Sequence, residues 1–296
     1  MQVPADESAT DANADMPTAS LYVVATPIGN LQDLSLRAIA VLKGADVIAA
    51  EDTRTSSTLL AHYGISAKLI AAHEHNEMEA AARIVELLHA GKRVALISDA
   101  GTPAISDPGA RLVRAVRAAG CAVIPVPGAN AAVAALSAAG FEGPFHFAGF
   151  LPPKSTARRA ALRAFSELAA TLVVYEAPHR IVELIDDLAL EYPGERRVVL
   201  ARELTKRFES IHTTTAAEAP AWLAGDTNRQ RGEFVVLVEA APAQAREVGS
   251  EAERVLGLLL AELPVKTAAK LAAAISGAPR NALYARALEL KQDSGS

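Results

Sequence analysis

The chain has 296 residues, 51% of them hydrophobic, which is enough for about two domains with sizeable apolar cores. Its single cysteine, Cys121, excludes an intrachain disulfide, a Cys-based zinc site and an iron–sulfur cluster, and it favours a reducing, cytoplasmic location. The net charge is −5, and the first twenty residues hold four acids and no base, so this start is unlike a signal peptide and we do not expect export. No apolar stretch approaches the ~18 residues of a membrane helix, and we expect no membrane partner.

Residues 1–20 are polar and acidic without periodicity, which predicts a disordered tail. From Leu21 to residue 140, short apolar segments alternate with amphipathic segments that end at glycines. The apolar segments read LYVVA, DVIAA, RVALIS and CAVIPV. Because strands that are apolar on both faces belong to parallel sheets covered by helices, we predict an α/β domain over 21–140.

Within this domain, Asn76 and Glu79 have the spacing of a capping box, so we expect a helix to begin there and to end at Gly91. Beyond the turn-rich stretch from Gly140 to Pro153, the segments FHFAGF, TLVVYEA, RRVVLAREL and GEFVVLVEA predict a second α/β domain over 141–241. Residues 242–296 read as helices only. The predicted fold is therefore two α/β domains and a small C-terminal helical segment.

Four predicted strand ends carry loops rich in Gly, Pro and small polar residues: TPIGNL (26–31), SDAGTPAISDPG (98–109), PVPGANA (125–131) and YEAPHR (175–180). Ligands of open α/β sheets bind at such strand ends, and small residues let a ligand approach the backbone. Any one of these loops could equally be an ordinary tight turn. The chain lacks the motifs GxxxxGK[ST], GxGxxG, GxSxG and HExxH, which removes support for nucleotide hydrolysis and dinucleotide redox chemistry.

An ordered set of motifs over about residues 21–240 resembles the tetrapyrrole methylase superfamily, and specifically its bacterial branch that methylates the 2′-oxygen of a cytidine in 16S ribosomal RNA. The motifs are TPIGNLQDLSLRA, EDTR, HEHNE, VALISDAGTPAISDPG, PVPGANAAVAAL, FAGFLPPK, YEAPHR and RELTKRFE. The C-terminal pattern KTAAKLAAAISGAPRNALY is similar to the end of the same branch.

This resemblance implies S-adenosylmethionine as the cofactor, held in a cleft between the two α/β domains, a homodimer, and 16S ribosomal RNA of the small subunit as the partner. The positions that match cofactor contacts of the superfamily are Pro27, Ala100, Gly101, Thr102, Ile105, Asn130, Ala131, Glu176 and Leu204. Two other functions stay open: C-methylation of a tetrapyrrole or corrin precursor, and a binding protein that has lost catalysis.

Methyl transfer to a ribose hydroxyl needs a base that removes the proton of the hydroxyl. Lys206 is one candidate if burial near Arg202 and Arg207 lowers its pKa, although Glu203 and Glu209 act in the opposite direction. His75 is the other, because an imidazole with the ordinary pKa of ~6.5 is mostly neutral at pH 7.

Glu51 and Glu176 are predicted to orient the reacting groups, although acids are also common at helix starts such as that after Glu51. Two imidazoles alternating at His73 and His75 are too few for a metal site, and we expect no metal.

Binding of RNA requires cations gathered on one face. One predicted RNA-binding set is Lys154, Arg158, Arg159 and Arg163, with no acid between Glu142 and Glu167. The others are His179 with Arg180, and the C-terminal helices. A helix with one solvated basic face explains the first set equally well, and the C-terminal helices could instead form a cap or a dimer contact.

Overall fold

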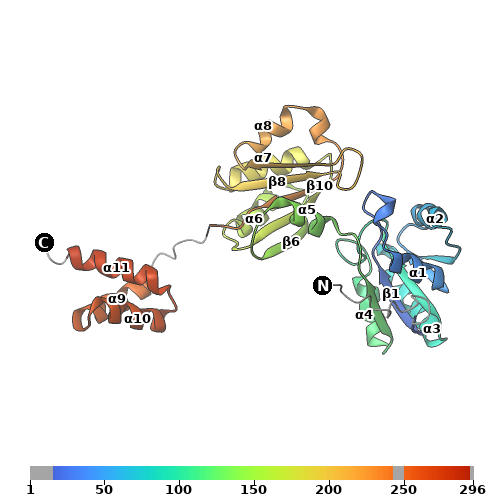
Figure 1. The fold of residues 1–296 in the computed structure, drawn as a ribbon, viewed down its shortest axis with the longest axis horizontal. Coiled ribbons are helices and arrows are strands. Elements are labelled where there is room, and N and C mark those ends of the chain that lie inside the picture. Colours follow the sequence, from blue (N-terminus) through green and yellow to red (C-terminus); the bar gives the residue numbers. More distant parts are fainter. Residues whose placement is uncertain (1–15, 243–249, 294–296) are drawn as a thin grey trace, which may run out of the picture. The chain divides into compact units, whose positions relative to one another are not determined.

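The structure, a computed structural model, describes residues 16–242 and 250–293. The chain divides into two compact units, of which one ends at Glu239 and the other begins at Ala240. Among these described residues, the first unit contains two five-stranded sheets with helices on their faces, and the second contains three helices (Figure 1). The predicted fold class is confirmed.

The first sheet is wholly parallel and has the strand order β3-β2-β4-β1-β5. Its strands are β1 (Ser20–Val24), β2 (Val47–Ala50), β3 (Lys68–Ala71), β4 (Arg93–Ile97) and β5 (Ala122–Val126). Because parallel strands end at the same edge, the loops 26–31, 98–109 and 127–130 come together there. β3 lies at the side of the sheet and pairs only with β2.

Helices cover both faces of this sheet, as the continuous apolar strands require. Leu21 of β1 packs with α3 (Glu77–His89) and α4 (Ala110–Ala118), while its neighbour Tyr22 packs on the opposite face with α1 (Leu36–Gly44) and α2 (Thr53–His62). Successive side chains of a strand point to opposite faces, so both faces of β1 are buried.

The predicted disordered tail, residues 1–20, extends too far along the chain. Ser20 is the first residue of β1 and pairs with Arg93 of β4. The Nε of Arg93 donates to the carbonyl of Met16 at 3.1 Å, and the hydroxyl of Tyr22 donates to the carbonyl of Pro17 at 2.8 Å. Residues 16–20 therefore belong to the fold, and the rest of the predicted tail lies outside the described residues.

The predicted capping box at Asn76 and Glu79 is wrong. The Asn76 side chain accepts a hydrogen bond from the backbone of His73 instead, and α3 begins at the next residue, Glu77. The buried carboxylate of Glu77 accepts three backbone N–H groups, from Gly109, Arg111 and Leu112 at 3.0, 2.8 and 3.1 Å. Since α4 has no capping side chain of its own, Glu77 satisfies its free N–H groups from a neighbouring helix.

The second sheet is mixed, with the order β6-β7-β10-β8-β9. Its strands are β6 (Phe145–Phe150), β7 (Thr171–Glu176), β8 (Arg197–Arg202), β9 (Ser210–Thr215) and β10 (Phe234–Val238). β6 and β7 are parallel and the other pairs are antiparallel. The register places Phe234 between Glu176 and Arg202, so the ends of β7 and β8 meet the start of β10 at one edge.

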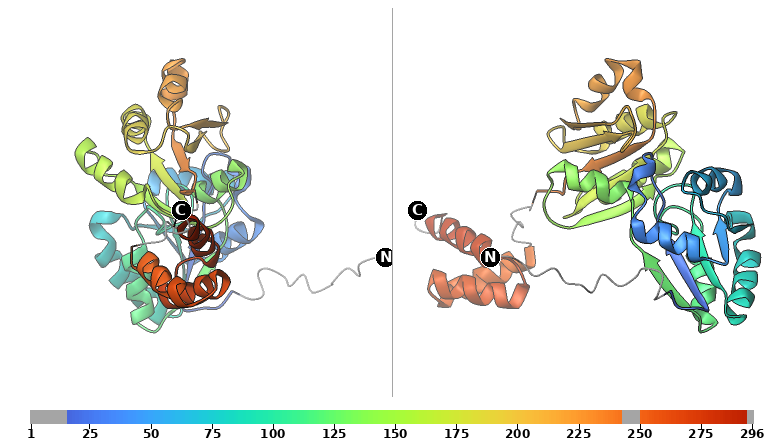
Figure 2. Two further views of the ribbon diagram at one scale, coloured as in Figure 1. Left: turned by 90° about the vertical axis from the view of Figure 1, so that its left-hand side faces the viewer. Right: turned by 45° about the vertical axis from the view of Figure 1, so that its right-hand side comes forward.

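Two sets of helices cover the second sheet from opposite sides (Figures 1 and 2). The helices on one side are α6 (Ser155–Phe165), α7 (Ile181–Glu191) and α8 (Ala219–Ala224). The helix on the other side is α5 (Ala131–Ala139), whose alanines pack on Val173, Val199 and Leu237. The predicted domain boundary at residue 140 assigns α5 to the first domain, whereas its buried face packs on the second sheet.

The C-terminal unit consists of α9 (Ser250–Glu262), α10 (Val265–Ser276) and α11 (Arg280–Asp293), joined by a core of small and aliphatic residues such as Leu256, Ala269 and Leu283. In the part of the chain that the structure describes, none of the helices combines the length and apolarity that crossing a membrane demands.

Replacing Glu77 with Ala is expected to lower the free energy of unfolding of the first unit by about 2 kcal/mol, because three N–H groups of α4 lose their acceptor. Glu79→Ala is the matched control, since Glu79 lies exposed on the same helix. Urea unfolding followed by circular dichroism measures both variants, and an equal loss of stability in the two would contradict the capping role.

Candidate active site

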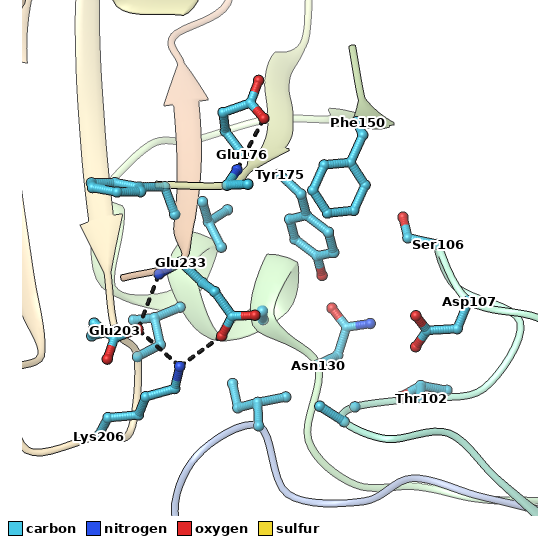
Figure 3. A pocket seen from close by; sticks show the side chains of 18 residues that line it. Thr102, Ser106, Asp107, Asn130, Phe150, Tyr175, Glu176, Glu203, Lys206 and Glu233 are labelled. Atoms are coloured by element: carbon cyan, nitrogen blue, oxygen red, sulfur yellow. Dashed lines mark hydrogen bonds and ion pairs between the residues drawn. The ribbon is translucent and has the colours of Figure 1, made fainter. Parts of the chain in front are cut away.

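A cavity of about 220 Å³ lies where the carboxyl edge of the first sheet faces the β7, β8 and β10 edge of the second (Figure 3). Its walls come from seven regions of the sequence. The lining residues are Ile28, Ala100, Gly101, Thr102, Ser106, Asp107, Asn130, Ala131, Phe150, Tyr175, Glu176, Ala177, Glu203, Leu204, Lys206, Glu233, Phe234 and Val235.

The cavity brings together most of the residues predicted to contact the cofactor. Those lining it are Ala100, Gly101, Thr102, Asn130, Ala131, Glu176 and Leu204. Pro27 instead lines a neighbouring cavity, and Ile105 is exposed and lines neither of the two.

Backbone pairing holds the two loops of the first sheet that form one wall. Thr26 and Gly101 exchange two hydrogen bonds, with N···O distances of 2.8 and 3.0 Å, and the Thr26 hydroxyl donates to the carbonyl of Ser98 at 3.1 Å. Gly101 has a φ of +76°, which a side chain would strain. Thr102 donates its hydroxyl to the carbonyl of Ala129 at 3.1 Å and thereby joins this wall to the loop before α5.

The opposite wall carries an ion-pair network (Figure 3). The Nζ of Lys206 lies 2.8 Å from an oxygen of Glu203 and 2.6 Å from one of Glu233, and the backbone N–H of Glu233 also donates to Glu203. Burial lowers the pKa of Lys206, but hydrogen bonds to the two carboxylates outweigh it, so the net pKa is raised. The role of Lys206 as the base was predicted on the condition that its pKa is lowered. That condition is wrong, because the sequence did not reveal Glu233 as a second partner.

Strained backbone lies in both walls. Ala104 and Ser106 in one wall, and Glu203 and Thr205 in the other, have φ between 53° and 69°. Non-glycine residues seldom adopt this region, and such strain concentrates at ligand-binding and catalytic sites.

Three carboxylates lie in or near the wall formed by the loops of the first sheet. Burial, followed by the nearby charge of Glu51, raises the pKa of Asp107 to about 6, and Asp99 adds to the effect. Burial also raises the pKa of Glu51, whose carboxylate accepts the backbone N–H of Asp99 at 3.4 Å. Glu51 does not itself line the cavity but acts on Asp107, which does.

Glu176 is fully buried at the end of β7. One of its oxygens accepts the backbone N–H of Ala177 at 2.9 Å and lies 3.2 Å from Nε of Arg180, while the other has no hydrogen-bond partner among the described residues. Arg180 also donates to the carbonyl of Leu151 at 2.7 Å. The guanidinium of Arg180 is thus held by contacts within the protein. His179, which is predicted to bind RNA together with Arg180, is exposed.

His75 does not line the cavity. It lies in the short 3-10 helix η2 (Glu74–Asn76) beyond β3, and β2 separates β3 from the strands that carry the site. Among the described residues, no group of three or more His, Cys, Asp or Glu is arranged to hold a metal ion.

The basic segment is largely occupied by internal ion pairs. Arg158 is 1% exposed and binds Asp187 at 2.6 Å and Glu183 at 3.1 Å, so its predicted role in RNA binding is wrong. Arg159 and Arg163 both pair with Glu191 but keep 39% and 57% of their side chains exposed. Lys154 is exposed at the start of α6. The burial of the Arg158 guanidinium is explained by the acids of α7, which lie about thirty positions away in the sequence.

Sequence reasoning missed several residues of the cavity, among them Asp107, Tyr175 and Glu233. Asp107 and Tyr175 do occur within the small-residue loops SDAGTPAISDPG and YEAPHR, so their position at strand ends was a usable signal. Glu233 had no such signal, because only the pairing of β10 with β7 and β8 brings it to the cavity.

With this geometry, the comparisons with known proteins define the class. The family described as Tetrapyrrole (Corrin/Porphyrin) Methylases matches residues 20–220, and the family described as RsmI C-terminal HTH domain matches residues 246–291. Two solved structures share the fold. The uroporphyrin-III-C-methyltransferase of Thermus thermophilus has a TM-score of 0.54 and is 23% identical, and the match covers 75% of this chain and 94% of that one. A cobalt precorrin-4 methyltransferase has a TM-score of 0.56 and is 18% identical, and the match covers 75% of this chain and 95% of that one. The chain belongs to the tetrapyrrole methylase family.

Within that family, the chain is similar to proteins named ribosomal RNA small subunit methyltransferase I. The one from Pseudomonas aeruginosa is 54% identical over 277 residues, which are 93% of this chain and 98% of the relative. The one from Escherichia coli O157:H7 is 50% identical over 278 residues, which are 94% and 97% of the two chains. The predicted family is confirmed.

Gly29→Ala is expected to weaken binding of S-adenosylmethionine at least about tenfold, because the added methyl group would collide with the loop that carries Leu204 and Lys206 and displace its backbone. A Cβ at Gly29 would lie 2.4 Å from Cγ of Lys206 and 3.1 Å from the backbone oxygen of Leu204, which lines the cavity. Calorimetric titration measures the affinity. Gly257→Ala is the control, because nothing lies within 4 Å of the added atom, and unchanged affinity in Gly29→Ala would exclude this contact from shaping the site.

Proposed function

We propose that the protein transfers a methyl group from S-adenosylmethionine to the 2′-hydroxyl of a cytidine in 16S ribosomal RNA of the small subunit. The observation that carries the proposal is the cavity itself, because seven positions expected to contact the cofactor line it in a chain 50–54% identical to ribosomal RNA small subunit methyltransferases.

The cavity suits a ligand that is partly apolar and carries a positive sulfonium. Ile28, Leu204 and Val235 offer an apolar surface for an adenine ring, while Asp107 and Glu233 supply negative charge. Gly101 keeps the backbone of the first wall open to close approach, because its positive φ excludes a larger side chain without strain. These residues are the ones that would hold the cofactor.

When bound, S-adenosylmethionine would supply an electrophilic methyl group to the ribose oxygen, with the thioether as the leaving group. The protein has to position the hydroxyl and take up its proton. Asp107 and Lys206 both line the cavity, but Asp107 fits this second task better. Its raised pKa makes it a stronger base than an ordinary carboxylate, whereas the raised pKa of Lys206 keeps that amine protonated. Glu51 and Asp99 act through their charges on Asp107, and Tyr175 faces it from the second sheet.

The RNA would contact surfaces beyond the cavity. Lys154, His179 and the exposed parts of Arg159 and Arg163 remain available near α6 and β7. In the C-terminal unit, Lys266 and Lys270 lie exposed one turn apart on α10, which suits phosphate contacts. We also infer a homodimer acting in the cytoplasm, as the resemblance to the RNA-methylating branch implies.

The experiment that tests the function is transfer of labelled methyl groups from S-adenosylmethionine to purified small subunits, with uroporphyrinogen as the alternative acceptor. We expect label in 16S RNA only, and nuclease mapping with mass spectrometry to place it on the ribose of a cytidine. Label in uroporphyrinogen would favour C-methylation of tetrapyrroles, and label in neither acceptor would favour a binding protein without catalysis.

Asp107→Asn is expected to reduce single-turnover transfer by about 10²–10⁴-fold and to remove the rise of the wild-type rate through pH 6, where the carboxylate becomes ionised. A wild-type rate that stays flat across pH 5–7, or an Asn variant with normal activity, would exclude Asp107 as the proton acceptor.

The stability of Asp107→Asn provides a readout besides activity. A raised pKa means that folded Asp107 binds a proton more tightly than unfolded Asp107, so wild-type stability falls as pH rises from about 4 to 6. The Asn variant lacks this loss. Its stability relative to wild type should therefore increase over that pH range in urea unfolding, independently of any effect on methyl transfer.

A further inference from the structure

A second cavity, of about 500 Å³, lies beside the first and shares Ile28 and Ala100 with it. The loop 26–31, the start of the loop 98–109 and the first two turns of α2 surround it. A ligand in this cavity and a ligand in the first would therefore both contact Ile28 and Ala100.

The lining of the second cavity combines apolar and polar side chains. The apolar ones are Pro27, Ile28, Leu31 and Leu59. Hydroxyls and one carboxylate come from Thr55, Ser56, Thr58, Ser98 and Asp99. A flat ring with a polar edge fits such a surface, because its face can pack on apolar groups while its edge forms hydrogen bonds.

Two of the polar groups have hydrogen-bonding capacity left. Ser56 is 2% exposed and its hydroxyl has no hydrogen-bond partner among the described residues, which is costly unless a ligand satisfies it. Asp99 accepts the backbone N–H of Asp52 with one oxygen, at 3.0 Å, and its other oxygen accepts from no donor among the described residues.

The charge of this cavity excludes an anionic ligand. Its lining includes Asp99 but neither Lys nor Arg, Glu51 and Asp52 lie close by, and the nearby cation Arg54 is paired with Asp52 at 2.7 Å. A phosphate or the carboxylates of a tetrapyrrole would be repelled, whereas an uncharged ring that donates from an amino group would be attracted. A carboxylate that accepts from the exocyclic amine is the usual protein partner of cytosine.

We propose that this second cavity receives the base of the target nucleotide, turned out of the RNA, and that Asp99 accepts a hydrogen bond from its amino group. The inference rests on the proposed function and deepens it by assigning the substrate site. The ribose of that nucleotide would then reach the shared wall, next to the cavity that contains Asp107.

The test fills the second cavity without touching the first. Thr58→Trp places an indole from α2 into it, and we expect kcat/KM for small subunits to fall at least about 100-fold while the affinity for S-adenosylmethionine stays within about twofold. Ser57→Trp is the matched control, because Ser57 is exposed on the same helix and does not line the cavity; it should behave as wild type.

Normal transfer by Thr58→Trp, or loss of cofactor binding by it, would overturn the assignment of the second cavity to the substrate. Failure of the wild-type protein to methylate small subunits is a separate result, which would overturn the proposed function and this inference with it.

A second variant tests the role of Asp99. Asp99→Asn keeps an oxygen for the N–H of Asp52 and replaces the other acceptor with a donor. Rates are measured on reconstituted small subunits with cytidine or uridine at the methylated position. We expect the cytidine-to-uridine rate ratio to fall at least about tenfold, because the NH₂ group of the new asparagine would face the amino group of cytidine and could not accept a hydrogen bond from it. An unchanged ratio would remove Asp99 from base recognition.

Discussion

The paired backbone of Thr26 and Gly101 is the contact on which both cavities depend. Each residue belongs to a loop that would otherwise be free to move at the end of a strand, and each loop contributes one residue to both cavities, Ile28 and Ala100. Two hydrogen bonds between the loops therefore fix the common wall. Glu77 supports the same arrangement at the far end of the 98–109 loop, where it holds the start of α4.

Charge is distributed unequally around this wall. On the side of the first sheet, Glu51, Asp99 and Asp107 face few cations, and the pKa of Asp107 is raised to about 6 as a result of burial and this repulsion. On the side of the second sheet, Lys206 pairs with both Glu203 and Glu233, and its hydrogen bond helps to lower the pKa of Glu203 despite burial. The two halves of the site thus supply different chemistry: one holds a carboxylate whose proton affinity is increased, and the other holds carboxylates that are paired with a lysine.

The backbone strain at Ala104, Ser106, Glu203 and Thr205 has a related origin. These residues lie in loops that are held at both ends, by the Thr26–Gly101 pairing and Glu77 on one side and by the Lys206 network on the other. Strained conformations persist only where the surroundings determine them from several directions. The same contacts that form the cavity therefore keep these four residues in place.

The sequence by itself determined most of the strands and helices, the parallel character of the first sheet and the family, because apolar periodicity and the order of short motifs are local properties. It did not reveal β3 and β9, which lie at the sides of their sheets and whose segments KLIA and SIHTTT are short or largely polar. The resemblance to the family supplied the nine positions expected to contact the cofactor, and seven of them line the first cavity.

Only the tertiary structure decided what each charged side chain does. Arg158 and Arg159 are neighbours in one basic segment, yet the first is buried against Asp187 and the second is partly exposed. The pKa of Lys206 is raised by hydrogen bonds to Glu203 and Glu233, and that of Asp107 is raised by burial and by the charge of Glu51. Glu233 and Glu51 are distant in the sequence from the groups they act on. The pKa and accessibility of a charged group depend on all the groups packed around it, and strand pairing across the two sheets brings those groups together.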